Sequence, residues 1–199
     1  MTFQKPRFQK PRFVRLTIAF LTLAVAAGFT QNAALPQSVE FSTTTYEAPA
    51  FYATFPVPDK DKGVTYSSQN VTLKSGATAV MNTYALSLHN DFDAFLIIYC
   101  DANLQGDTAG LDIMLDGAIA TLENAKPGPK TDSTFSGFRA RAVVATSTYT
   151  SGQTTGHRTT YERITVQGTR VWQALVLCDK TTNCTEADAN RFFNSIKIR

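Results

Sequence analysis

The chain has little charge and no compositional repeat. Charged side chains make up 18% of its 199 residues, and its 11 glycines and 8 prolines form no periodic run. Collagen and a charge-patterned coiled coil are therefore excluded, and a hydrophobic content of 43% argues against intrinsic disorder. A chain of this length has room for one domain of ordinary size.

Acidic residues are missing from the N-terminal part. Five of the 19 basic residues lie before position 16, whereas all 16 acidic residues lie at Glu40 or beyond. The rest of the chain then carries 14 basic and 16 acidic side chains, a net charge of −2, although the whole chain is +3. A basic surface for nucleic acid on the folded part is not expected.

A long membrane-spanning run is also missing. Residues 16–29 form an uncharged apolar segment of 14 residues, which is short of the roughly 20 that span a bilayer. The segment follows a basic stretch and contains Ala24-Val25-Ala26, a small-x-small cleavage pattern. We predict a signal peptide over residues 1–26, an exported protein that is periplasmic or secreted, and membrane contact during export only. The alternative is an uncleaved anchor.

The chain has three cysteines, Cys100, Cys178 and Cys184. In an oxidising compartment this count gives one disulfide and one free thiol. A strand that reverses into a helix would bring Cys178 close to Cys184, and we predict this pair, with Cys100 buried and free. The pair of Cys100 with Cys178 is the competitor, because each follows an apolar segment and precedes an aspartate.

Residues 27–50 are polar and rich in threonine, and we predict a flexible lead-in to a single domain over residues 51–199. In that domain, alternation of apolar and polar residues predicts strands and a 3.6-residue spacing predicts helices. The predicted strands lie near 51–55, 63–73, 80–88, 92–100, 138–144, 157–166 and 169–178, and the helices near 111–122 and after Thr185. We expect an α/β chain of the α+β type, a mainly antiparallel sheet with two helices packed on it.

Four segments in chain order resemble the PsbP-like and DcrB-like exported proteins. They are Phe51-Tyr52-Ala53-Thr54-Phe55-Pro56, the glycine-led strand at 137–141, the hairpin at 161–172 and the helix end at 191–198. The resemblance implies an α-β-α sandwich and a non-catalytic accessory or binding role. It carries over no catalytic residue, and fold alone does not fix function.

The loop from Asp101 to Asp112 is the sharpest candidate for chemistry. It places oxygen donors at loop positions 1, 3 and 5, glycine at 6 and an acid at 12, which is close to a calcium loop. Position 5 is Gln105 and position 12 is an aspartate with a short side chain, so both depart from the pattern. The simpler interpretation is a strand-to-helix loop with Asp107 as the helix cap and Asp112 near the helix start.

Two further groups of residues are ambiguous. His89-Asn90-Asp91 has ligand-type side chains, but the same residue types are typical of a hairpin turn, whereas His157 stands alone. Five arginines on three neighbouring strands predict either a patch for an anionic partner or a solvated sheet face paired with Glu162. These arginines are Arg139, Arg141, Arg158, Arg163 and Arg170.

The sequence contains no serine elbow and no phosphate-binding glycine loop. We therefore predict no catalytic, cofactor-binding or metal-binding residues, and an exported, non-enzymatic binding or accessory protein of the cell envelope. Its partner is expected to be an unidentified protein or small molecule there. The alternative is a calcium-dependent protein or a hydrolase that uses the loop from Asp101 to Asp112.

Overall fold

The computed structural model describes residues 39–59, 62–72, 78–89, 91–102, 106–151 and 154–199. The predicted signal peptide, residues 1–26, lies outside the described residues. So do the first part of the predicted lead-in and residues 103–105 of the candidate calcium loop.

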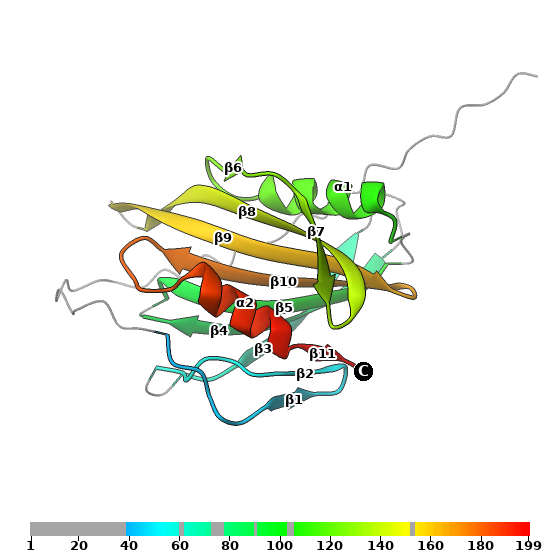
Figure 1. Ribbon diagram of the computed structural model, residues 1–199, viewed down its shortest axis with the longest axis horizontal. Helices are drawn as coiled ribbons and strands as arrows, with labels where there is room; N and C mark the ends of the chain where they lie inside the picture. The colour runs from blue at the N-terminus through cyan, green and yellow to red at the C-terminus, as the bar shows by residue number, and fades with distance from the viewer. Residues whose placement is uncertain (1–38, 60–61, 73–77, 90, 103–105, 152–153) are drawn as a thin grey trace, which may run out of the picture.

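A large antiparallel sheet forms the body of the protein (Figure 1). Eight strands build it in the order β3-β4-β5-β10-β9-β8-β6, with β7 also paired to β8. Their bounds are β3 Thr65–Thr72, β4 Thr78–Leu88, β5 Asp93–Asp101, β6 Lys126–Pro127, β7 Thr131–Phe135, β8 Phe138–Ser151, β9 Thr154–Gln167 and β10 Arg170–Asp179. The β9–β10 connection is the tight turn predicted at Gln167-Gly168, where Gly168 has φ +59° and so takes a conformation that glycine adopts easily.

A second, three-stranded sheet joins the two ends of the described chain. It consists of β1 Tyr46–Ala48, β2 Phe51–Ala53 and β11 Lys197–Ile198, in the order β1-β2-β11. Residues 39–50, expected in the flexible lead-in, are therefore part of the fold, and Phe41 and Ala48 are buried. The prediction of a flexible segment rested on its threonines, whereas its buried apolar side chains pack it into the aromatic core.

One face of the large sheet carries the main aromatic core, and we call it the α2 face. The helix α2, Glu186–Ser195, packs on it together with the small sheet (Figure 1). Phe192 of α2 lies 5.0 Å from the ring of Phe55 and 5.4 Å from that of Phe95, measured between centroids. Trp172 of β10 is fully buried on the same face. Thr185 and Asp188 form the predicted capping box at the start of α2.

The opposite face, which we call the α1 face, is covered in part by the helix α1, Thr108–Ile119. Leu111, Met114, Leu115 and Ile119 of α1 belong to a smaller apolar cluster with side chains from β8, β9 and β10. Alternation along the strands sends neighbouring residues to opposite faces, so Val171 contacts the α1 cluster while Trp172 belongs to the α2 face.

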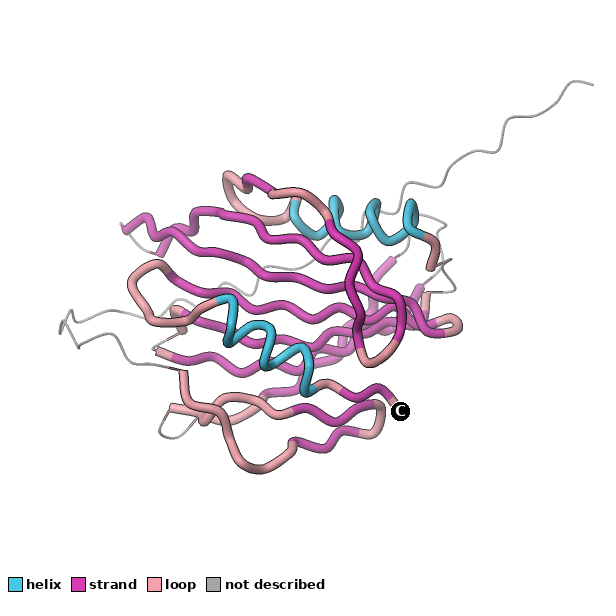
Figure 2. The backbone as a smooth tube through the Cα atoms, viewed as in Figure 1, coloured by secondary structure: helices cyan, strands magenta, loops and turns pink. Residues whose placement is uncertain are grey.

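The predicted fold class, α/β with an α-β-α sandwich, is wrong. Strands hold 55% of the described residues and helices 15%, so this is a β-rich fold (Figure 2). The α2 face is closed by one helix and a small sheet together, and short segments with weak periodicity supply that sheet. The two helices were visible in the sequence, but the four strands of two to five residues at 46–48, 126–127, 131–135 and 197–198 were not.

Candidate functional site

A row of polar side chains, four of them buried and Arg158 half-buried, crosses the α1 face of β8, β9 and β10. Arg158, Thr160 and Glu162 occupy alternate positions of β9 and therefore point to the same face. Cross-strand pairing places Ser147 of β8 opposite Arg158. Gln173 of β10 lies one diagonal step from Glu162 on the same face. We call these five residues the α1-face cluster.

Glu162 and Gln173 form the most deeply buried pair of the cluster. The amide Nε2 of Gln173 donates to Oε1 of Glu162 at 2.7 Å, and the two residues are 2% and 1% exposed, respectively. Burial raises the pKa of Glu162 to about 8, against the smaller opposing effect of the Gln173 hydrogen bond. Glu162 is therefore mostly protonated and uncharged at neutral pH.

Each residue of the α1-face cluster holds a buried polar atom without a hydrogen-bond partner among the residues that the structure describes. These atoms are Ser147 Oγ, Arg158 Nε, Thr160 Oγ1, Glu162 Oε2 and Gln173 Oε1. A buried polar group left unpaired costs about 1–3 kcal/mol, and native proteins contain few. Of the six such atoms among the described residues, five thus lie on one face of three adjacent strands, and the sixth is Nε1 of Trp172 on the α2 face.

Tyr149 supports one end of the cluster. It faces Gly156 across β8 and β9, and a Cβ atom at Gly156 would come within 2.2 Å of its ring, so only glycine leaves room for the ring there. The Tyr149 hydroxyl donates to Asp179 at 2.7 Å, and the Arg158 guanidinium lies 4.0 Å from the ring centroid. Burial is the main cause that raises the pKa of Tyr149 and lowers that of Arg158.

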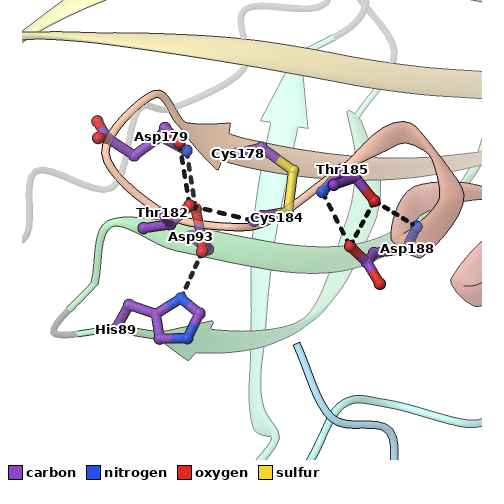
Figure 3. Close-up of a disulfide and its surroundings, with 8 residues drawn as sticks. All are labelled: His89, Asp93, Cys178, Asp179, Thr182, Cys184, Thr185 and Asp188. Atoms are coloured by element: carbon purple, nitrogen blue, oxygen red, sulfur yellow. Dashed lines mark hydrogen bonds and ion pairs between the residues drawn. A yellow bond between two sulfur atoms is a disulfide. The ribbon is translucent and has the colours of Figure 1, made fainter. Parts of the chain in front are cut away.

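A second buried network lies beside the disulfide at the end of β10 (Figure 3). Asp93 is fully buried, and its Oδ1 accepts from the backbone N–H of Asp179 and from the Thr182 hydroxyl at 2.8 and 2.9 Å. Its Oδ2 lies 2.5 Å from Nδ1 of His89. Burial is the main cause that raises the Asp93 pKa, against these hydrogen bonds. The network ties the β4–β5 turn to the loop that carries the disulfide.

The disulfide joins Cys178 at the end of β10 to Cys184 just before the α2 cap, with Cα atoms 5.2 Å apart (Figure 3). Cys100 is a buried free thiol on the α1 face, and burial raises its pKa. A thiol in that setting stays protonated and is a poor nucleophile.

The aspartates of the candidate calcium loop are engaged by other groups. Asp101 accepts two hydrogen bonds from Arg170 at 2.8 and 2.9 Å, and this lowers its pKa. Asp107 caps α1 by accepting from the N–H of Gly110. Asp112 binds Arg141 of β8 at 2.7 Å. Across the described residues, no group of three or more metal-ligating side chains comes together.

The histidine candidates lie apart. His89 and Asp91 have φ of +54° and +70°, as turn residues do, and Asn90 lies outside the described residues. The imidazole of His89 contacts Asp93, whereas Asp91 binds Lys62. His157 is exposed on β9.

The five arginines do not form one patch. Arg139, Arg141 and Arg158 lie on the α1 face, and Arg163 and Arg170 on the α2 face. Arg163 contacts α2 through Asn190 and Asn194, so it holds that helix rather than facing solvent. Glu162, interpreted from the sequence as a solvated partner of these arginines, is instead buried against Gln173. Burial of Glu162 could have been predicted from the spacing in β9. Thr160, Glu162 and Ile164 occupy alternate positions and share one face of the strand, and Ile164 is an apolar core residue.

Comparisons with known proteins identify no family for this chain. No protein-family model matches the chain, and no curated protein matches it in sequence. Solved structures that resemble it include LpqN of Mycobacterium tuberculosis, described as involved in cell envelope biogenesis. The two share 15% identity over 79% of this chain and 91% of that chain, with a TM-score of 0.43. A likeness at this level carries no argument about function. In the described part of the chain, neither helix is long and apolar enough to cross a membrane.

Proposed function

We propose that this chain is an exported, non-enzymatic binding protein that holds a small molecule against the α1 face. The observation that carries the proposal is the α1-face cluster, in which five buried polar atoms lack partners. A purely structural network is usually satisfied within the protein, because each unpaired group costs stability. A bound molecule with matching polar groups would remove that cost.

Export is supported by two independent features. Residues 1–29 have the order of a signal peptide. The disulfide between Cys178 and Cys184 is of the kind that persists in oxidising compartments. The intact mass of the protein recovered from the envelope fraction tests this part. We expect a chain shortened by about 26 residues, two hydrogens lighter than the reduced form. A full-length chain in the membrane pellet would contradict cleavage.

Binding is tested by native mass spectrometry of the protein purified from its own envelope under mild conditions. We expect a small-molecule adduct on the wild-type chain and its loss from a double variant, Glu162→Met with Gln173→Met. This variant keeps the side-chain volume and removes the polar atoms, and such replacements are often neutral for folding. Absence of any adduct, together with no thermal shift in a broad metabolite screen, would contradict a binding function.

A further inference from the structure

The two edges of the large sheet differ in how well they are protected. β3 forms one edge and pairs with β4 alone, whereas β6 and β7 both pair with β8 at the other edge (Figure 1). A free edge exposes backbone N–H and C=O groups with which another strand can pair, so proteins usually shield it with short strands, prolines, charges or bulges. Only one of the two edges of this sheet carries such features.

The edge formed by β6 and β7 is the protected one. β6 has two residues and contains Pro127, which has no N–H to donate, and Lys130 adds a positive charge just before β7. The carbonyl of Lys130 accepts from Arg141. In β7, the carbonyl of Thr134 accepts from Arg163. The short strands and the two arginine contacts interrupt the backbone groups that this edge could offer to another strand.

The β3 edge has none of these protections. The strand has eight residues, spans about 26 Å, and contains no charged residue, no proline and no glycine. Its register with β4 runs without a bulge from Thr65 opposite Ala85 to Thr72 opposite Thr78. Six of the eight residues are exposed and none is buried. Alternate residues of β3 therefore direct their N–H and C=O groups to a side where no described strand pairs with them.

Side-chain contacts hold β3 in its extended form. The ring of Tyr66 lies 4.9 Å from that of Tyr84, and its hydroxyl donates to Asn82 at 2.8 Å, although Tyr66 is 55% exposed. The Thr65 hydroxyl donates to a carbonyl of β4 at 3.1 Å. On the other face of the strand, Val71 packs against the apolar cluster under α1. A strand that pairs with this edge meets backbone already in place, which lowers the entropy cost of association.

A second copy of this chain supplies a matching strand. The large sheet of such a copy offers no other open edge, because its β6 and β7 are protected, so it can pair with β3 only through its own β3. Two β3 strands related by a two-fold axis perpendicular to the sheet are antiparallel, and residues of the same face lie opposite each other. The pairing uses the same surface of both copies, so it closes at two chains and does not extend into a fibre.

The side chains of β3 are complementary to themselves in this arrangement. The longest overlaps pair residues 65–71 with Ser68 at the axis, or residues 66–72 with Gln69 at the axis. In both registers every opposed side chain is uncharged, and hydroxyl, amide and β-branched side chains meet, so no like charges oppose the pairing. The nearest described charge before the strand, Lys62, is held by Asp91 at 2.9 Å.

We propose that two copies of this chain associate edge to edge through β3, so that their large sheets form one continuous antiparallel sheet. This inference does not depend on the proposed binding function, since the contact lies at the sheet edge and leaves the α1-face cluster aside. A single pair of strands buries less area than a standard protein interface. We therefore expect a reversible dimer with a dissociation constant of about 1–100 µM.

Sedimentation velocity tests the dimer with oxidised protein purified from the envelope fraction, over about 1–500 µM. Ser68→Lys brings two positive charges opposite or diagonal to each other across the axis in either register. It should raise the dissociation constant about tenfold or more, and high salt should restore part of the loss. The matched control is Val80→Lys, at an exposed position of β4 one strand in from the edge, which should behave as wild type. Gln69→Lys repeats the test on the other face of β3, and circular dichroism checks the folding of each variant.

Engineered cysteines read the register. Residues opposite themselves at the axis have Cα atoms about 4.5–5.5 Å apart, within the range of a disulfide. Oxidation should therefore cross-link either Ser68→Cys or Gln69→Cys into a dimer. Val80→Cys is the control, because two strands separate it from its counterpart in the other copy, and it should stay monomeric. Cys100 is buried and takes no part.

Three outcomes would overturn the inference. The first is a protein that remains a monomer at about 500 µM. The second is a dimer whose dissociation constant is the same in the wild type and in both lysine variants of β3, which would place the interface elsewhere. The third is cross-linking of Val80→Cys as readily as of the two β3 cysteines, which would show random collision rather than a strand pair.

Discussion

The same strands supply both faces of the large sheet, but the two faces are covered differently. On the α2 face, aromatic rings from four separate segments pack together. Four of these rings are almost wholly buried, those of Trp172, Phe51, Phe95 and Phe192. On the α1 face, one helix of 12 residues covers only part of the surface, and buried polar atoms remain unpaired beside it. The α2 face holds one such atom, Trp172 Nε1, against five on the α1 face. Unpaired buried polar groups are rare in a core that serves stability alone, so the contrast favours the α2 face as the main source of stability and the α1 face as the place for the proposed recognition.

The largest expected effect comes from a cavity in the aromatic core of the α2 face. Phe192→Ala removes the ring that packs against Phe55 and Phe95, and we expect it to lower the free energy of unfolding by about 3–5 kcal/mol. Urea denaturation followed by circular dichroism measures the loss. Phe192→Leu is the matched control and should lose clearly less. A loss below about 1 kcal/mol for the alanine variant would show that this face is not the main core.

The second effect concerns the network beside the disulfide. Asp93→Ala leaves the backbone N–H of Asp179 and the Thr182 hydroxyl without their acceptor, and we expect a loss of about 2–3 kcal/mol. Asp93→Asn keeps an acceptor oxygen for them and should lose less. Thermal unfolding of both variants at one pH makes the comparison. Equal losses in the two would mean that charge, and not hydrogen bonding, is what Asp93 contributes.

The smallest expected effect is a pH dependence of the folding stability that comes from Glu162 on the α1 face. Glu162 binds its proton more tightly when folded, with a pKa of about 8 against 4.5 in the unfolded chain. The folded state thus holds more protons between these values, and stability falls as pH rises through this window. For this one group the linkage relation gives a loss of about 2 kcal/mol between about pH 6 and pH 8. Glu162→Gln should remove that part of the pH dependence. A variant with the wild-type slope would show that the acid is already ionised in the folded protein.

Most long elements could be predicted from the sequence, because their patterns are local. Residues 80–88 alternate and form β4, and residues 111–122 follow the helical period and give α1. The small sheet could not be predicted, since β11 is two residues long and pairs with β2 far away in the sequence. Its existence depends on packing against the α2 face and leaves no periodic signal.

The candidate site was harder to predict than the fold. Alternation in β9 placed Glu162 and the nearby arginines on strands, but it did not say which face each side chain would take or how deeply each would be buried. Gln173 could not be selected from the sequence, because a single glutamine in an apolar strand has no motif around it. Its role depends on a partner 11 residues away on the neighbouring strand.

The pairing of β11 with β2 has a consequence for the order in which the molecule can assemble. Residues 51–52 hydrogen-bond with residues 197–198, and the N–H of Arg199 donates to the carbonyl of Ala50. The small sheet that covers the aromatic core therefore forms only after nearly every residue of this sequence has been made. Contacts of such long range form slowly, because the intervening chain must first lose its freedom. A chain threaded through a translocation channel needs that delay, since it must stay open until it reaches the other side.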